Sequence, residues 1–237
     1  MDQQDAWDKE YKSQQLLSPS TVPQADVVRF FRWLKKRKKR AGEPLDMGQV
    51  RLLDLGSGTG RNCLYAAQQG ASAIGFEFSP MALTLAKKFT AHAEVAVDYR
   101  LQDIGKPYPL PDASVDIVLD ITSSNSLSDA GRQVYLRETH RVLSPGGQML
   151  VRALSFEGDT HAKELVKRSP GSDPDSYVHP DLGIVEKVFS RDSFRAAYEP
   201  FFTINELERV QHYATVAGRT YKRSYWIAYL EKADARG

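Results

Sequence analysis

The sequence predicts an α/β protein with a doubly wound, seven-stranded sheet, mostly parallel, with helices on both faces and an antiparallel hairpin at its C-terminal end. The first observation is an apolar stretch at residues 50–55 that runs through three alternating glycines into a helical pattern. The second is the alternation of strand-like and helix-like segments as far as residue 154. The third is a closing pair of long alternating segments at residues 201–212 and 221–232. Strands that alternate with helices form parallel sheets, and a helix-free pair of strands closes as a hairpin.

The first strand and its loop predict a ligand site. Gly56, Gly58 and Gly60 allow a sharp turn and a close backbone approach, because glycine has no Cβ. The helix that follows, at residues 61–69, directs its first N–H groups at this loop. The spacing G-x-G-x-G differs from the dinucleotide fingerprint G-x-G-x-x-G, and no Gly-Lys-Ser/Thr of a P-loop follows. The spacing therefore counts against a nicotinamide-dependent oxidoreductase.

The remaining elements follow in a regular order. Predicted strands lie at residues 71–77, 95–102, 114–120 and 148–154, and a turn at residues 143–147 precedes the last of them. Helices are predicted from Ser79-Pro80, where serine caps and proline opens the first turn, and across residues 129–143 and 190–198. Residues 155–185 depart from this rhythm and predict an inserted cap or mobile loop of the kind that carries specificity.

The first 48 residues predict a helical extension to a main domain at residues 49–237. Trp7 and Tyr11 are one helical turn apart, which suits a short helix docked on the core or a lid over the site. A second helix ends in the run Lys35-Lys-Arg-Lys-Lys-Arg40. These cations either complement the helix dipole in solvent or contact the phosphates of RNA or DNA.

Composition and charge exclude several classes of protein. A chain of 237 residues suits one α/β domain, and the single cysteine, Cys63, excludes an intrachain disulfide framework or Cys-rich zinc site. The net charge of only +2 argues against a surface that binds nucleic acid throughout. Neither a secretory signal nor a membrane-spanning run is recognised, so a cytoplasmic protein is expected, and no His/Cys cluster suggests a metal.

The stretch Leu53-Asp-Leu-Gly-Ser-Gly-Thr-Gly60 resembles motif I of the class I S-adenosylmethionine-dependent methyltransferases, which have a Rossmann-like fold. The turn Arg141-Val-Leu-Ser-Pro-Gly-Gly147 resembles the turn before their fifth strand, and residues 60–65 locally resemble the tellurite-resistance and thiopurine methyltransferase branch. This resemblance implies S-adenosyl-L-methionine as cofactor.

The resemblance also implies roles for individual residues. Glu77, 17 residues after the last glycine, would bind the ribose hydroxyls, as its position at a strand end also suggests. Asp103 would bind the adenine amino group, while Arg61 or Asn62 would meet the methionine carboxylate. The full set of predicted cofactor-binding residues is Asp54, Gly56, Ser57, Gly58, Gly60, Arg61, Asn62, Glu77, Phe78, Asp103, Ile104 and Asp120.

The predicted reaction is in-line methyl transfer to a small-molecule acceptor. Candidates for the acceptor site are Tyr11, Asp120, Tyr177, His179 and Tyr213, each of which also suits an ordinary loop or packing residue. An Asn/Asp-Pro-Pro-Tyr motif after the fourth strand and a nucleophilic cysteine are absent, which excludes exocyclic-amine and pyrimidine-carbon methyltransferases. Two alternatives stay open: a methyltransferase that acts on RNA or protein through the basic helix end, and a cofactor-binding module without turnover.

Overall fold

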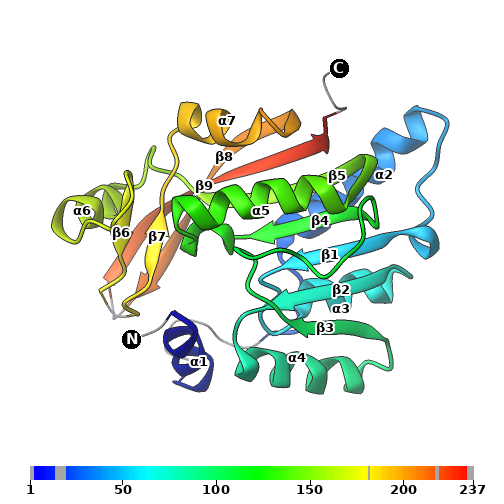
Figure 1. Ribbon diagram of the computed structural model, residues 1–237, viewed down its shortest axis with the longest axis horizontal. Coiled ribbons are helices and arrows are strands. Elements are labelled where there is room, and N and C mark those ends of the chain that lie inside the picture. The colour runs from blue at the N-terminus through cyan, green and yellow to red at the C-terminus, as the bar shows by residue number, and fades with distance from the viewer. Residues whose placement is uncertain (1–2, 14–19, 181, 217–218, 234–237) are drawn as a thin grey trace.

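The computed structural model describes residues 3–13, 20–180, 182–216 and 219–233. Its main sheet has seven strands in the order β3-β2-β1-β4-β5-β9-β8 (Figure 1). The first five of these are parallel, and β9 runs antiparallel to both β5 and β8. This arrangement confirms the predicted sheet and its closing hairpin. The strands are β1 (Arg51–Leu55), β2 (Ser72–Glu77), β3 (Val97–Leu101), β4 (Val115–Ile121), β5 (Leu143–Leu154), β8 (Phe202–Val216) and β9 (Arg219–Lys232).

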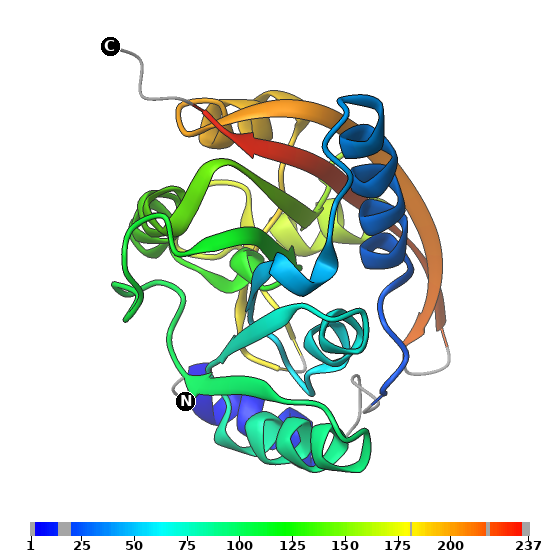
Figure 2. The same ribbon diagram turned by 90° about the vertical axis from the view of Figure 1, so that its right-hand side faces the viewer.

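Helices cover both faces of the sheet, as the sequence predicts (Figure 2). One face carries α2 (Ala25–Arg40), α3 (Arg61–Gln68) and α4 (Pro80–His92), and the other carries α5 (Asp129–Val142) and α7 (Arg191–Tyr198). Val27, Phe30, Phe31 and Leu34 of α2 are all buried against the sheet. Because these residues recur at helical spacing, α2 has one continuous apolar face and packs into the same core as β1.

The turn before the fifth strand differs from the prediction. The strand β5 begins directly after α5, at Leu143, rather than after a separate turn at residue 148. Its pairing with β4 jumps from Val115↔Leu143 to Ile117↔Gln148, so residues 144–147 form a bulge inside the strand. Gly146, with φ +69°, accommodates this bulge.

The inserted segment is folded. It contains α6 (Thr160–Arg168) and a small antiparallel sheet of β6 (Ser176–Val178) and β7 (Val185–Lys187). Asp159 fixes its start, because its carboxylate accepts hydrogen bonds from Arg223 (3.0 Å) and from the Ser224 backbone (3.1 Å) of β9. The rest of the chain adds α1 (Gln3–Ser13), two short 3₁₀ helices, η1 (Met47–Gln49) and η2 (Ser124–Ser126), and loops.

The N-terminal extension packs on the main domain. The helix α1 lies beside α4, at the side of the sheet toward which the arrowheads of β1, β2 and β4 point (Figure 1). Residues 14–19, between α1 and α2, lie outside the described residues. Across the described part of the chain, no helix combines the length and apolar character needed to cross a membrane.

Candidate active site

A cavity of about 810 Å³ lies at the carboxyl ends of the parallel strands. Open α/β sheets bind their ligands at this edge. The cavity is formed by the loops after β1, β2, β3 and β4, by the start of α5, and by α1. The predicted site residues that line it are Tyr11, Gly56, Ser57, Gly58, Arg61, Asn62, Glu77, Phe78, Asp103 and Ile104.

The glycine loop leaves no space for side chains. Gly56 (φ +68°) and Gly58 (φ +56°) adopt left-handed backbone conformations. A Cβ on Gly56 would lie 2.3 Å from the Ser123 hydroxyl oxygen, and one on Gly58 would lie 2.8 Å from the Tyr11 hydroxyl oxygen. The loop therefore exposes bare backbone to the cavity, which suits close contact with a ligand.

Glu77 ends β2 and lines the cavity although it is only 6% exposed. One carboxylate oxygen accepts from the backbone N–H of Gly58 (2.8 Å), and the other accepts from those of Phe78 and Ser79 (both 2.8 Å). Burial raises the pKa of Glu77, although these three hydrogen bonds act in the opposite direction. A carboxylate oxygen can accept two hydrogen bonds, so the oxygen that binds Gly58 can take a further hydroxyl donor.

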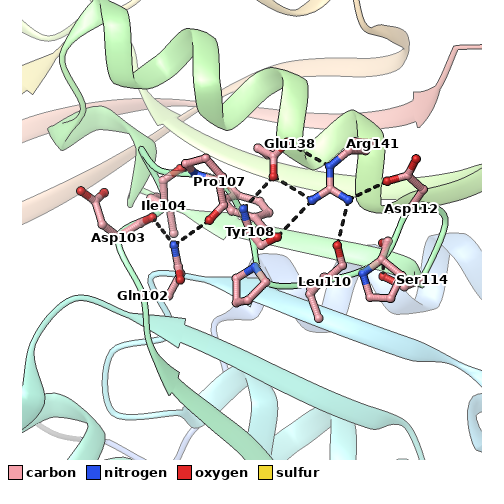
Figure 3. A network of polar contacts seen from close by, with 12 residues as sticks. Gln102, Asp103, Ile104, Pro107, Tyr108, Leu110, Asp112, Ser114, Glu138 and Arg141 are labelled. Carbon is pink, nitrogen blue, oxygen red and sulfur yellow. Dashed lines mark hydrogen bonds and ion pairs between the residues drawn. The ribbon is translucent and has the colours of Figure 1, made fainter.

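Asp103 and Ile104 lie in a loop after β3 that α5 holds in place. Arg141 donates to the carbonyl oxygen of Tyr108 (3.1 Å) and to Glu138 (2.7 Å), and Glu138 accepts from the Tyr108 backbone (2.6 Å). Figure 3 shows this network, with Asp103 and Ile104 at its other end. The contacts to α5 make the loop a fixed wall of the cavity.

Arg61 and Asn62 begin α3 and have different environments. The Asn62 side-chain oxygen accepts from the backbone N–H of Gln24 (3.1 Å), which ties α3 to the start of α2. Arg61 lines the cavity, where burial lowers its pKa, Asp54 attracts it and Arg152 repels it. Arg61 is thus the cation best placed for a carboxylate.

Asp54 lies behind the loop rather than in the cavity lining. It is 1% exposed, and the thiol of Cys63 donates to its carboxylate at 3.5 Å. Burial raises the pKa of Asp54 to about 7. Gly60 is also outside the lining. A Cβ there would lie 2.1 Å from the Tyr99 hydroxyl oxygen, so this position packs against β3.

Asp120 is fully buried, and its carboxylate is engaged within the protein. It accepts from the backbone N–H groups of Ser123 (2.9 Å) and Ser124 (3.2 Å) and from the hydroxyl of Tyr135 (2.6 Å). Burial raises its pKa. The structure therefore places Asp120 as an anchor for the loop after β4, away from the cavity surface.

The other three acceptor candidates lie elsewhere. Tyr177 is fully buried in β6, where its hydroxyl donates to Glu186 (2.5 Å). His179 follows β6, and Tyr213 is 75% exposed on β8. None of the three lines the cavity, nor does any described residue of the segment 155–185.

A family match covers the part of the chain from β1 to β5. Residues 53–151 match the methyltransferase domain family. The chain contains a class I S-adenosylmethionine-dependent methyltransferase domain. The matched span begins in β1 and ends in β5, so it includes the glycine loop, Glu77 and Asp103.

Two curated relatives are similar in sequence to this methyltransferase domain. One is an arsenite methyltransferase of Halobacterium salinarum, with 34% identity over 42% of this chain and 26% of that protein. Another is a ubiquinone biosynthesis O-methyltransferase of Bradyrhizobium diazoefficiens, with 30% identity over 51% of this chain and 46% of that protein. The chain thus spans less than half the length of these relatives. The crystal structure of TehB from Haemophilus influenzae shares the fold, with a TM-score of 0.64 and 16% identity over 98% of this chain and 67% of that one.

The residues of the methyltransferase domain fit its donor. The family implies S-adenosylmethionine, a molecule with a carboxylate, a ribose and an adenine. Arg61, Glu77 and Asp103 follow β1, β2 and β3 in that order and all line the cavity. The bare loop at Gly56 and Gly58 allows the donor to lie against the backbone.

The rest of the cavity wall contains residues that are not among the predicted site residues. They come from the loop after β4, the start of α5, the loop after β3 and α1, and they include Trp7, Lys106, Thr122, Ser126, Leu127 and Val134. Arg132 of α5 holds this wall, because its guanidinium donates to the carbonyl oxygen of Leu127 (2.8 Å) and also contacts that of Ser124. The helical spacing of Trp7 and Tyr11 is a sequence signal for the part of this wall that α1 forms.

Proposed function

We propose that this protein transfers a methyl group from S-adenosylmethionine to a small-molecule acceptor. The observation that carries the proposal is a single cavity that is lined both by the glycine loop and by largely uncharged residues of α1, of the loop after β4 and of the start of α5. Its volume of about 810 Å³ falls within the range of small-molecule sites, roughly 300–1,000 Å³. Such a space suits a donor and a compact acceptor side by side.

The donor supplies a methyl group that is activated on a positive sulfur. For this donor, Glu77 would bind the ribose hydroxyls, Asp103 the adenine amino group and Arg61 the carboxylate. Hydrogen bonds hold Glu77 and Asp103 in place, and Arg61 is the first residue of α3. The protein thereby orients the donor without having to move its own backbone, which is the main requirement for an in-line displacement.

The acceptor would lie between Trp7, Leu127 and Val134, with Thr122 and Ser126 as hydrogen-bonding partners. Burial raises the pKa of Tyr11 far above neutrality, so its hydroxyl stays protonated and can donate a hydrogen bond. Alignment of two bound reactants can lower the activation free energy by ~7–11 kcal/mol. We therefore assign the rate enhancement mainly to positioning and exclusion of water. An acceptor with an acidic proton would lose that proton to solvent before it enters the site.

The names of the relatives support a small acceptor. Arsenite and a ubiquinone precursor are small molecules, and the matching proteins are named for their methylation. Their differing chemistry leaves the acceptor atom open, since one is named for arsenic and the other for oxygen.

The nucleic-acid alternative has less support in the geometry. Within the basic run, Arg37 binds Gln148 (3.0 Å) and Glu231 (2.5 Å), and Lys38 pairs with the nearby Glu43 (3.3 Å). Gln148 lies near the amino end of the parallel part of β5, so this end of α2 is at the opposite edge of the sheet from the cavity. A polymer held there would have to extend around the domain to present its acceptor atom to the donor.

The proposal is tested with a labelled methyl donor in fractionated cell extract. We expect label to enter a fraction of low molecular mass and expect none with the Glu77→Ala protein. Label in RNA or protein, reduced when the basic run is neutralised, would favour that alternative. Donor binding without label in any fraction would favour a module without turnover.

A further inference from the structure

Hydrogen bonds attach the helix α1 to residues 78–81, within a short segment, residues 77–81, that also forms part of the donor site. The side-chain amide of Gln4 donates to the carbonyl oxygen of Phe78 (2.7 Å). Asp8 accepts from the hydroxyl of Ser79 (2.5 Å) and from the backbone N–H of Met81 (3.0 Å) with the same carboxylate oxygen. These hydrogen bonds join residues more than 70 positions apart in the chain.

Asp8 completes the N-terminal cap of α4. Ser79 is the N-cap residue, and its hydroxyl oxygen accepts from the Ala82 backbone (3.1 Å). Asp8 takes the neighbouring free N–H, that of Met81, and places a carboxylate at the positive end of the helix dipole. Burial disfavours the charge, yet the hydrogen bonds from Ser79 and Met81 leave the pKa of Asp8 below its usual value.

The same segment contains two residues of the cavity. Glu77 and Phe78 line it, and the backbone N–H of Ser79 donates to Glu77 (2.8 Å). On the other side, α1 places Trp7 and Tyr11 in the lining. The predicted ribose contact, Glu77, is therefore only four positions before Met81, the last residue that Asp8 contacts.

We propose that Asp8 is a positioning residue that couples the docking of α1 to donor binding. The inference rests on the proposed function, because it assumes that the donor contacts Glu77. A donor that orders residues 77–81 strengthens the surface on which α1 docks. By reciprocity, a docked α1 raises donor affinity by the same factor. Asp8 acts in this way through Ser79 and Met81 without touching the donor.

The test compares Asp8→Ala with Asp5→Ala, a matched change at an exposed position on the same helix. The ligand is S-adenosylhomocysteine, measured by calorimetry, with amide hydrogen exchange of residues 3–13 as the second readout. We expect Asp8→Ala to weaken binding about five- to tenfold, the lower part of the range for coupled sites, and Asp5→Ala to change it less than twofold. The ligand should protect α1 in the unaltered protein and much less in Asp8→Ala.

Asp8→Asn serves as the conservative variant. Its side-chain oxygen still accepts from Ser79 and Met81, so it should recover most of the affinity lost in Asp8→Ala. Equal affinity and equal protection of α1 in Asp8→Ala and Asp5→Ala would overturn the coupling while leaving the donor site intact. If the unaltered protein binds neither S-adenosylmethionine nor S-adenosylhomocysteine, the proposed function fails as well.

Discussion

Replacement of Asp120 distinguishes a structural anchor from a catalytic group. In Asp120→Ala, the N–H groups of Ser123 and Ser124 and the hydroxyl of Tyr135 lose their carboxylate acceptor. Each buried group left unsatisfied costs ~1–3 kcal/mol. The Tyr135 hydroxyl can turn to Tyr198, so two N–H groups stay unsatisfied and we expect a loss of roughly 2–6 kcal/mol. That is a large part of the ~5–15 kcal/mol stability of an ordinary domain. Asp120→Asn keeps one oxygen acceptor and should lose only about 1 kcal/mol.

The assay is urea unfolding of both variants, with Asp112→Ala as the matched control. Asp112 is exposed and pairs with Arg141 at 2.7 Å, so its removal should cost less than about 1 kcal/mol. Asp120→Asn should retain affinity for S-adenosylhomocysteine and most of its turnover. The anchor account is refuted if Asp120→Ala is as stable as Asp112→Ala. It is equally refuted if Asp120→Asn abolishes turnover with stability and donor affinity unchanged.

Three further predictions concern the donor loop. In calorimetry, Glu77→Gln should weaken the binding of S-adenosylhomocysteine tenfold or more, because hydrogen bonds to a charged group contribute ~1.5–3 kcal/mol. An unchanged affinity would exclude Glu77 as a donor contact. Gly58→Val should abolish the binding of S-adenosylhomocysteine. Gly146→Val should not, because Gly146 has a similar φ of +69° but lies in open space. Equal losses of affinity in the two variants would indicate general backbone strain instead. Burial raises the pKa of Asp54 from 3.8 to about 7, so the folded state binds its proton more tightly than the unfolded state. Stability should therefore fall as pH rises from about 4 to 7, and Asp54→Asn should remove up to about 4 kcal/mol of that fall in denaturation measured across this range; an identical profile would contradict the burial argument.

The sequence was informative wherever local spacing decides the structure. Two of the three alternating glycines, and the acidic residues Glu77 and Asp103 after the next two strands, were predicted as site residues and line the cavity. Strand ends of a parallel sheet meet at one edge, so these positions follow once the strands are placed. The apolar residues at helical spacing between positions 27 and 34 likewise match the face of α2 that packs on the sheet.

The acceptor wall could not be predicted in the same way. Asp120 lies at a strand end as Glu77 does, yet it accepts hydrogen bonds from the loop after β4 and from α5, a contact that no local pattern reveals. Leu127 lines the cavity from the loop before α5, which Arg132 and Asp120 fix, and Val134 lines it from α5 itself. Tyr177 and Tyr213 have suitable chemistry, but the tertiary fold places them in the inserted sheet and on an exposed strand.

The most direct test of the central claim is calorimetric titration of the unaltered protein with S-adenosylhomocysteine, alongside Glu77→Ala and NADH. The account predicts one site per chain for S-adenosylhomocysteine, a much weaker interaction in a folded Glu77→Ala protein, and no binding of NADH. Absence of binding to the unaltered protein, or equal binding by Glu77→Ala, would contradict the assignment of this cavity as a methyl-donor site.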